Sequence, residues 1–450
     1  MLTIIILTVA AVLILFLGFA RQRGLILPVA MLALVASLVA MHYPEWTETS
    51  VLTGMLHFDL TSFVLCILQF VFALCIIPFL HQFRQRGNEE LGDITGLFLL
   101  ALIGGMIMVS YQNFIMMFLG IEILSISMYV LAGADRRRIT SNEAAIKYFI
   151  MGSFASAILL FGIGAIYAST GSLSFGNVLP GMDKFYQIGV LFVLSGLAFK
   201  IALVPFHFWA PDVYEGTPTI FTAIMSSIVK IAGFGALLQF LKLSSATLPE
   251  WVFWFLLLIA LVTIVVGNIM AYNQTSVKRI LAYSGIVQAG FILIAVLKIT
   301  PQTEKILIYY LIAYGAASLI TFLITHFVER QSGSDHLDSF GGLLKANPLL
   351  GILMIIALIS LGGGPLTAGF MAKFLVLREA VGLGFLSLAF VALVAAVISV
   401  YYYFKIINAI ASPSGDHSWS VSWRYNSVLL VLTLILIFFG IAPSFVMMHI

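Results

Sequence analysis

Residues 199–219 read FKIALVPFHFWAPDVYEGTPT, an apolar run that contains a lysine, Lys200, and a proline, Pro205. Proline removes a backbone donor and disrupts a helix at the turn before it. In hydrocarbon no water satisfies the carbonyl groups that such a break frees, so broken helices persist where they face protein or a wet cavity. If the chain around it lies in a membrane, this stretch predicts a discontinuous membrane helix that carries a buried charge.

The composition places the chain in a membrane. Of its 450 residues, 62% are hydrophobic and 9% are charged, whereas about a quarter of a soluble domain is charged. The net charge is +3 and no basic run is interleaved with aromatic residues, so nucleic acid is not an expected partner. The two cysteines, Cys66 and Cys75, exclude an iron–sulfur cluster held by this chain, because such a cluster needs about four cysteine ligands. Phosphate-binding loops, dinucleotide fingerprints and His/Cys metal spacings are missing.

Hydrophobic length gives the number of membrane crossings, since a spanning helix needs about 20 mostly apolar residues. We expect an all-α polytopic membrane protein with about fourteen transmembrane helices. Residues 1–20 are expected to be the first helix rather than a signal peptide, because no basic residues precede the apolar run. The segments run near residues 2–20, 25–42, 58–80, 94–110, 112–132, 146–169, 187–209, 218–243, 251–271, 276–297, 304–328, 348–378, 380–408 and 426–448.

Basic residues in the loops predict the orientation. The odd-numbered loops hold thirteen of the 22 lysines and arginines: Arg21, Arg23, Arg84, Arg86, Arg136, Arg137, Arg138, Lys278, Arg279, Arg330, Lys345, Lys405 and Arg424. The even-numbered loops hold five: Lys184, Lys242, Lys298, Lys305 and Arg378. Because cytoplasmic loops carry the excess of positive charge, we expect the odd loops in the cytoplasm and both termini outside. The remaining four are Lys147, Lys200, Lys230 and Lys373.

The twelfth segment is interrupted like the seventh. It reads IALISLGGGPLTAGFMAKFLVL, with Gly363, Gly364 and Pro365 near its middle. Two discontinuous helices five segments apart suggest an inverted repeat of helices 4–8 and 9–13, as in many transporters. We therefore expect a single transmembrane domain over residues 1–450. Its expected parts are N-terminal helices in 1–93, a first half in 94–243, a second half in 251–408 and a C-terminal helix in 426–448.

Four ionisable residues are predicted to lie deep in the membrane: Glu122, Lys200, Lys230 and Lys373. A charge at the centre of a membrane helix costs roughly 2.5–3.5 kcal/mol on the insertion scale. One interpretation is that these charges only hold helices together. A second is that they handle protons, and we favour it because a lysine stem, about 6 Å long, cannot bring such central charges to the surface.

Their chemistry suits proton transfer. Burial disfavours the charged form of a lysine, and a nearby carboxylate favours it. A change in the separation of Glu122 and Lys200 would therefore change how tightly Lys200 holds its proton, which the next lysine could then receive through water. Lysine readily adopts either protonation state on burial, whereas arginine stays charged.

Four further residues are secondary candidates. Lys147 is placed at the start of the sixth segment, where an interfacial anchor that pairs with Glu143 one helical turn earlier is the favoured interpretation. His207 and His326 lie toward the cytoplasmic ends of their segments. Each suits either a connection of the proton path to water or a structural role. Lys278 opens the tenth segment. Its first expected role is to set the orientation of the chain, and its second is to serve a proton entrance.

Three of these stretches carry a family resemblance. Residues 199–219, residues 276–290 (SVKRILAYSGIVQAG) and the run GIEILSISMYVLAG around Glu122 resemble the antiporter-like membrane subunits of NADH:quinone oxidoreductase (complex I). The run DVYEG over 212–216 and the run EAAIKYF over 143–149 look most like subunit N.

The related subunits fit less well. The pattern of subunit M has a glutamate where this chain has Lys373, and subunit L continues into a long lateral helix where this chain stops at Ile450. Mrp-type Na⁺/H⁺ antiporter subunits are the alternative family. One departure is Gln288, which stands where histidine is frequent in the family.

The resemblance implies specific roles. Glu122 and Lys200 match the family's ion pair, Lys230 its central lysine and Lys373 its outward-side terminal residue. It implies that this chain has no cofactor and that its partners are the other membrane-arm subunits of complex I. By the same resemblance, partner subunits of the complex carry FMN and iron–sulfur clusters and use NADH and quinone. It also implies a multi-pass protein of a bacterial-type cytoplasmic membrane that moves protons with internal water. The competing readings are a cation/proton antiporter component and a structural scaffold with an idle channel.

Overall fold

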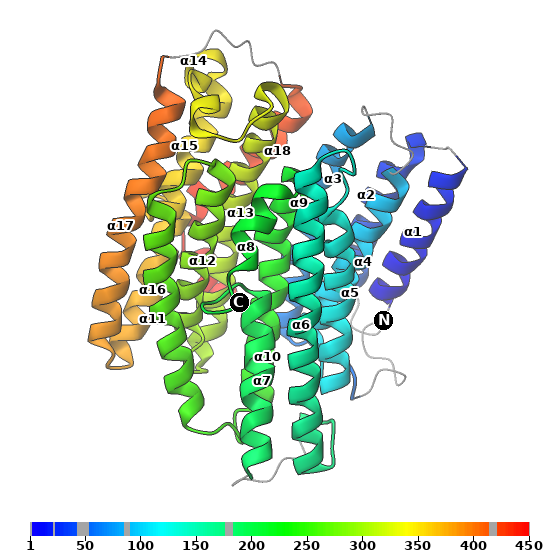
Figure 1. The fold of residues 1–450 in the computed structure, drawn as a ribbon, viewed down its shortest axis with the longest axis vertical. Coiled ribbons are helices and arrows are strands. Elements are labelled where there is room, and N and C mark those ends of the chain that lie inside the picture. The colour runs from blue at the N-terminus through cyan, green and yellow to red at the C-terminus, as the bar shows by residue number, and fades with distance from the viewer. Residues whose placement is uncertain are drawn as a thin grey trace. The chain divides into compact units, whose positions relative to one another are not determined.

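The structure is a computed structural model, and it describes residues 2–20, 23–42, 54–84, 91–175, 183–413 and 421–449. Within these ranges the chain is helical, with isolated β-bridges and no strand (Figure 1). The all-α prediction is therefore confirmed. Arg21 and Arg86, which contributed to the predicted orientation, lie outside the described residues.

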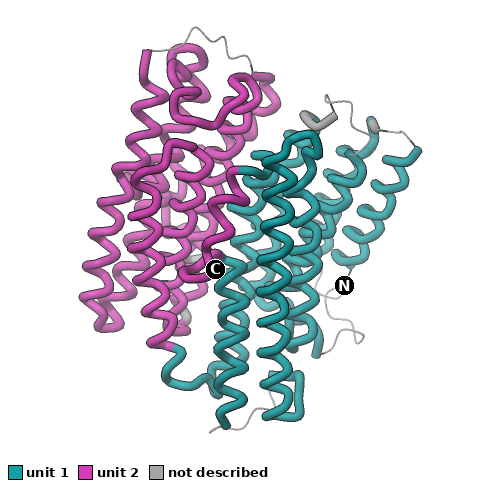
Figure 2. The backbone as a smooth tube through the Cα atoms, viewed as in Figure 1, with its two compact units in different colours: residues 1–201, 216–252 teal, residues 202–215, 253–450 magenta. Residues whose placement is uncertain are grey.

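The chain divides into two compact units (Figure 2). Unit 1 comprises residues 1–201 and 216–252, and unit 2 comprises residues 202–215 and 253–450. The chain therefore leaves unit 1 inside the seventh predicted segment and returns to it 14 residues later, at Gly216.

The helices of unit 1 are α1 (Leu2–Phe19), α2 (Arg23–Met41), α3 (Leu60–Arg84), α4 (Leu91–Ser110), α5 (Phe114–Ala132), α6 (Ile139–Thr170), α7 (Lys184–Lys200), α9 (Thr219–Ile224), the π-helix η4 (Met225–Val229) and α10 (Lys230–Leu243). Those that lie wholly or mainly in unit 2 are α8 (Trp209–Gly216), α11 (Trp251–Tyr272), α12 (Val277–Ala295), α13 (Pro301–Ser332), the 3₁₀-helix η5 (Leu337–Phe340), α14 (Leu343–Ala346), α15 (Pro348–Gly362), α16 (Ala368–Gly382), α17 (Leu386–Ala411), α18 (Trp423–Ile441) and α19 (Ser444–His449).

Twelve helices of the described chain are long and apolar enough to cross a membrane. With the two interrupted passages, α7–α8 and α15–α16, they account for the fourteen predicted segments. The protein itself covers some of them far more than others. The apolar window of residues 219–243 is 100% buried, and that of α18 is 22% buried. The passage that carries Lys230 is thus shielded from lipid, as an intramembrane charge requires.

The first break follows Lys200, the last residue of α7. Residues 201–208 are not helical, and Ala202 has a positive φ of 58°. The backbone N–H of Val204 donates to Thr263 Oγ1 at 3.0 Å, so a side chain of α11 replaces a lost helical partner. The break predicted from Pro205 is confirmed.

The second break separates α15 from α16. Gly363 ends α15 with a φ of 85°, and the N–H groups of Gly363 and Gly364 donate to the carbonyls of Ser360 and Ile359 at 3.0 and 2.8 Å. This closing turn uses the left-handed conformation that glycine adopts without steric cost. The break predicted at Gly363, Gly364 and Pro365 is also confirmed.

Two local features differ from the sequence prediction. Helix α6 begins at Ile139 rather than near 146, because the helix continues through polar residues that lower the apolar average. The passage that ends in α10 contains a π-helical turn, η4, directly before Lys230. Such turns are rare and are often found at functional sites.

Candidate functional site

Lys200 lies among polar and aromatic side chains of unit 1. It is 5% exposed, and its Nζ donates to Ser125 Oγ of α5 at 2.7 Å. The ring centroids of Tyr129 and Tyr148 lie 6.0 and 5.8 Å from Nζ. Aromatic faces at this distance attract a cation, so the ammonium has one hydroxyl partner and two weaker partners.

Glu122 lies on the same helix as this hydroxyl. Ser125 follows Glu122 by three positions on α5, which places the two side chains on neighbouring parts of one helix face. The Oε1 atom of Glu122 accepts a hydrogen bond from Ser156 Oγ of α6. Among the residues that the structure describes, Glu122 and Lys200 form no direct ion pair, and each bonds a serine instead.

Lys230 starts α10 and is 3% exposed. The hydroxyls of Ser226 and Ser227 in the preceding π-helical turn donate to the carbonyl of Ala223 at 3.0 and 2.6 Å. One turn after Lys230, a Cβ at Gly233 would lie 3.9 Å from Lys200 Cγ. The start of α10 therefore packs against the Lys200 stem, and unit 1 brings two of the predicted lysines to neighbouring positions.

Lys373 lies in unit 2 and has main-chain partners. It is the sixth residue of α16 and is 5% exposed. Its Nζ donates to the carbonyls of Leu361 and Gly362 at 2.9 and 3.1 Å and lies 5.2 Å from the centroid of the Phe291 ring. The two carbonyls belong to the last turn of α15, where a helix leaves carbonyls unpaired and favours positive charge.

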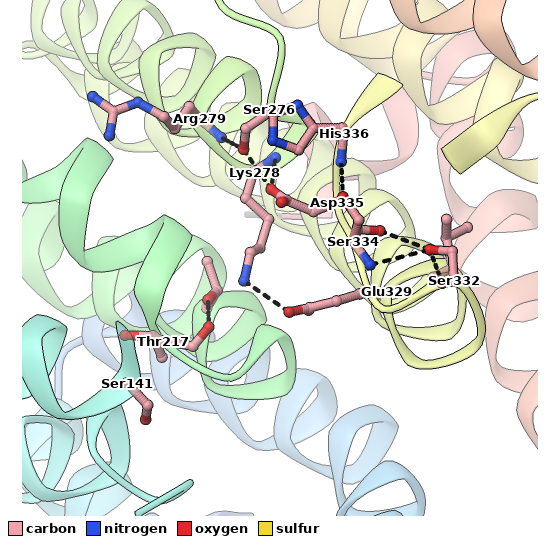
Figure 3. Close-up of polar contacts among 12 residues, drawn as sticks. Ser141, Thr217, Ser276, Lys278, Arg279, Glu329, Ser332, Ser334, Asp335 and His336 are labelled. Atoms are coloured by element: carbon pink, nitrogen blue, oxygen red, sulfur yellow. Dashed lines mark hydrogen bonds and ion pairs between the residues drawn. The ribbon is translucent and has the colours of Figure 1, made fainter. Parts of the chain in front are cut away.

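Lys278 belongs to a buried ionic cluster of unit 2 (Figure 3). It is 1% exposed, and its Nζ lies 3.5 Å from Glu329 Oε1 at the end of α13. Beside it, Asp335 accepts hydrogen bonds from Ser276 Oγ and from the Lys278 N–H, the latter at 3.4 Å. Of these three groups only Lys278 is a predicted site residue, because both carboxylates stand in a polar stretch that resembles a loop in sequence.

The next residue, Arg279, joins two of the sequence motifs. Its Nη1 donates to Asp212 Oδ1 at 2.9 Å and to Glu215 Oε2 at 2.8 Å. The DVYEG run on α8 is thereby held to the SVKRILAY run at the start of α12. This link fixes the second half of the broken passage within unit 2.

The other secondary candidates are placed apart from these contacts. Lys147 Nζ lies 2.7 Å from Glu143 Oε1, and both side chains are exposed, at 42% and 57%. His207 lies between α7 and α8, is 4% exposed, and its Nδ1 has no hydrogen-bond partner within the described chain. His326, on α13, is half-buried with its ring 5.9 Å from that of Phe327.

A metal site is not formed by the described residues, since no group of three or more His, Cys, Asp or Glu side chains among them is placed to hold an ion. The arrangement instead offers ammonium groups next to hydroxyls and carbonyls. An ammonium can release a proton and a hydroxyl can donate or accept a hydrogen bond, whereas a carbonyl only accepts one.

Known proteins resemble this chain in sequence and fold. Residues 112–399 match the family described as "NADH:quinone oxidoreductase/Mrp antiporter, TM". NADH-quinone oxidoreductase subunit N of Flavobacterium psychrophilum is 38% identical over 437 residues, which are 95% of each chain. A chain of respiratory complex I from Thermus thermophilus has a TM-score of 0.83 at 32% identity, covering 98% of this chain and 97% of that one. A chain of the Mrp complex from Dietzia sp. has a TM-score of 0.84 at 20% identity, with 98% and 94% covered, and so shares the fold.

Proposed function

The chain belongs to the NADH:quinone oxidoreductase/Mrp antiporter membrane family, and from this we propose that it is a subunit N-type, proton-translocating membrane-arm subunit of an NADH:quinone oxidoreductase. The observation that carries the proposal is the presence of three lysines at most 5% exposed inside membrane-spanning passages, two of them next to helix breaks. Each such charge costs several kcal/mol in a bilayer, so a structural role alone is a poor explanation for three.

The proposed path begins at the Glu122–Lys200 pair and continues through Lys230 to Lys373. Support for the step from Lys200 to Lys230 comes from the packing of α10 on the Lys200 stem one turn beyond Lys230. A shift of Glu122 on α5 would move its carboxylate relative to the ammonium of Lys200. When the carboxylate moves away, the charged form of Lys200 loses the group that favours it, and the ammonium would release its proton toward Lys230.

The energy for this transfer comes from partner subunits. NADH oxidation, FMN, the iron–sulfur clusters and quinone reduction are assigned to the rest of the complex. The two cysteines of this chain are too few for a cluster, which takes about four. The neighbours of this chain in the membrane arm would transmit the redox energy as a change in position or charge at Glu122.

We further propose a topology. The odd loops, which carry most of the lysines and arginines, face the cytoplasm of a bacterial-type membrane, and both termini face outward. The halves 94–243 and 251–408 are proposed as the two repeats, each with one interrupted passage. A reporter enzyme that is active only outside the cytoplasm, fused after Ile450, should be active. An inactive reporter on a well-expressed fusion would reverse the proposed topology.

The substitution Lys230→Ala tests the proton path. Membrane vesicles that contain the assembled complex should oxidise NADH with an artificial acceptor at the normal rate, while proton pumping falls by about tenfold or more, the range of a lost proton-transfer group. Lys184→Ala is the matched control, because Lys184 is an exposed lysine at the start of α7. Normal pumping by an assembled Lys230→Ala complex would remove that residue from the path.

Native purification tests the partners. A subunit of an NADH:quinone oxidoreductase should purify with flavin and iron–sulfur proteins. Purification without them, together with sodium- or potassium-dependent proton exchange, would favour a cation/proton antiporter. A relative named as subunit N matches 95% of this chain at 38% identity, which favours the first outcome.

A further inference from the structure

Gln288, on α12, uses all of its hydrogen-bonding groups around the second helix break. It is 2% exposed. Its Nε2 donates to the carbonyl of Leu361 at 2.8 Å and to the hydroxyl of Tyr403 at 3.3 Å, and its Oε1 accepts from the hydroxyl of Tyr310 at 2.5 Å. A carboxamide has two N–H donors and one carbonyl acceptor, so the donors and the acceptor of Gln288 are all engaged.

One of these partners is shared with Lys373. The carbonyl oxygen of Leu361 receives the Gln288 amide at 2.8 Å and the Lys373 ammonium at 2.9 Å. A carbonyl oxygen has two lone pairs, so it accommodates both donors. Gln288 and Lys373 therefore meet at the last turn of α15 without bonding each other.

The orientation of the amide is determined by its neighbours. Tyr310 donates to the Oε1 atom, so the Nε2 end points toward α15. The Tyr403 hydroxyl is also hydrogen-bonded to Ser284 Oγ at 2.5 Å. Tyr310 of α13 thus holds the Oε1 end of the amide, and Tyr403 of α17 shares the Nε2 end with the Leu361 carbonyl, beside the ammonium.

We propose that Gln288 is a positioning residue for proton transfer at Lys373, an inference that rests on the proposed function of this lysine. Its amide holds the Leu361 carbonyl at the end of α15 in the place where the ammonium binds. The hydrogen atoms of two donors converge on one oxygen, so their positive ends repel and the ammonium is held less firmly than by the carbonyl alone. A neutral amide in this position orients Lys373 without the carboxylate that would trap its proton.

Three substitutions of Gln288 separate this role from simple packing. Methionine keeps the volume but removes every hydrogen bond. Neutral histidine has one N–H donor and one acceptor nitrogen, so it can bond Leu361 and Tyr310 as the amide does. Glutamate keeps the acceptor for Tyr310 but places a negative charge beside Lys373. The measurement is proton pumping relative to NADH oxidation by the assembled complex in vesicles.

We expect Gln288→Met to lower the pumping ratio about three- to tenfold, the factor that corresponds to one hydrogen bond. Gln288→Glu should lower the ratio at least as far, and Gln288→His should restore most of it. Gln239→Met is the matched control, because Gln239 is a buried glutamine of α10 that donates to the carbonyl of Tyr111 at 3.2 Å. The control should leave the pumping ratio unchanged.

Normal pumping by Gln288→Met, or a defect in Gln288→His as large as that in Gln288→Met, would overturn the inference. If Gln288→Met does not assemble, Tyr310→Phe removes only the bond that orients the amide, and a normal pumping ratio in that variant would also overturn it. Lys373→Ala separates a failure of the proposed function of Lys373 from a failure of the inference on Gln288. Normal pumping in Lys373→Ala contradicts the proposed function of the lysine, whereas its loss together with a normal Gln288→Met contradicts this inference alone.

Discussion

The two interrupted passages present their lysines to different kinds of partner. Lys200 comes immediately before its break and donates to a side-chain hydroxyl, that of Ser125, at 2.7 Å. Lys373 comes after its break and donates to two main-chain carbonyls, those of Leu361 and Gly362, at 2.9 and 3.1 Å. Both lysines are 5% exposed, so burial does not distinguish them.

The difference lies in what each partner can do when the proton leaves. A hydroxyl accepts from an ammonium and can rotate to donate to a neutral amine, whereas a carbonyl only accepts. The surroundings of Lys200 therefore suit both protonation states, and those of Lys373 suit the charged state. Lys200 is fitted to exchange protons within the chain, whereas the two carbonyls around Lys373 bond its N–H groups in either state but offer no donor to the lone pair of the neutral amine.

Replacing each lysine with methionine tests this difference and should have the largest effects. Lys200→Met and Lys373→Met should each lower proton pumping by about tenfold or more, because each removes a proton carrier. Lys373→Met should in addition lower the stability of the complex by about 0.5–1.5 kcal/mol, since it removes the donor to the half-buried Gly362 carbonyl, while the Leu361 carbonyl keeps the Gln288 amide. Vesicle pumping assays and thermal unfolding of the purified complex measure the two effects.

Lys200→Met should leave thermal unfolding nearly unchanged, because Ser125 Oγ also bonds the carbonyl of Ile121 and keeps a partner. Equal losses of stability in the two variants would contradict the distinction between hydroxyl and carbonyl partners.

The backbone of the two breaks offers a second test, with a smaller expected effect. Gly363 has a φ of 85°, and an added Cβ would lie 3.1 Å from Lys373 Cδ. Gly363→Ala should therefore cost about 1–2 kcal/mol of stability for the left-handed residue and displace the lysine stem. Pumping should fall several-fold. Gly171→Ala is the control, because Gly171 also has a positive φ, of 65°, but has open space around its Cβ position. Equal pumping defects in both variants would show that the contact with Lys373 is unimportant.

Much of this arrangement is predictable from the sequence because a membrane restricts what a charge, a proline or a glycine can do. Lys200, Lys230 and Lys373 stand out as single charges in apolar runs, and the structure buries all three. Pro205 and the glycines near 363 mark breaks because proline removes a helical hydrogen bond and a glycine run relaxes the helix. Proline alone is not sufficient, since Pro28 and Pro78 lie inside the continuous helices α2 and α3.

The partners of these charges were not predictable, for equally physical reasons. Serine, tyrosine and glutamine are common in membrane helices, and which of them meets a lysine depends on how helices pack. Ser125, Ser156 and Tyr310 therefore carried no signal of their own. Glu329 was missed because a polar stretch at the end of α13 resembles a loop in sequence.

The hydroxyl partner of Lys200 gives a third test of the comparison. Ser125→Ala removes the acceptor of the ammonium and should lower the pumping rate by about two- to fivefold, the weight of a single hydrogen bond. Ser125→Thr retains the hydroxyl and should pump at nearly the normal rate. Initial rates of vesicle acidification provide the measurement. A full rate in Ser125→Ala would mean that the aromatic rings and water suffice to place Lys200.

A partly exposed lysine, Lys242, provides the smallest effect and the baseline for the buried ones. Lys242 Nζ lies 2.7 Å from Asp59 Oδ2, and their side chains are 25% and 29% exposed. Burial alone would raise the pKa of Asp59, but hydrogen bonds from Lys242 and Ser62 outweigh it and hold the pKa below its ordinary value of 3.8. The stabilisation by this carboxylate is therefore present above about pH 4 and is lost as the pH falls through the lowered pKa.

Lys242→Ala should therefore cost only about 0.2–1 kcal/mol at neutral pH and leave proton pumping unchanged. Because Asp59 keeps its bonds from Ser62, at 2.8 Å from the N–H, the variant should lose only part of the stabilisation that disappears in acid. Thermal unfolding of the complex at pH 7 and near pH 4 measures this. A pumping defect in Lys242→Ala comparable to that of Lys200→Met would show that exposure does not separate structural lysines from proton carriers in this chain, and would weaken the inference drawn from burial at both breaks.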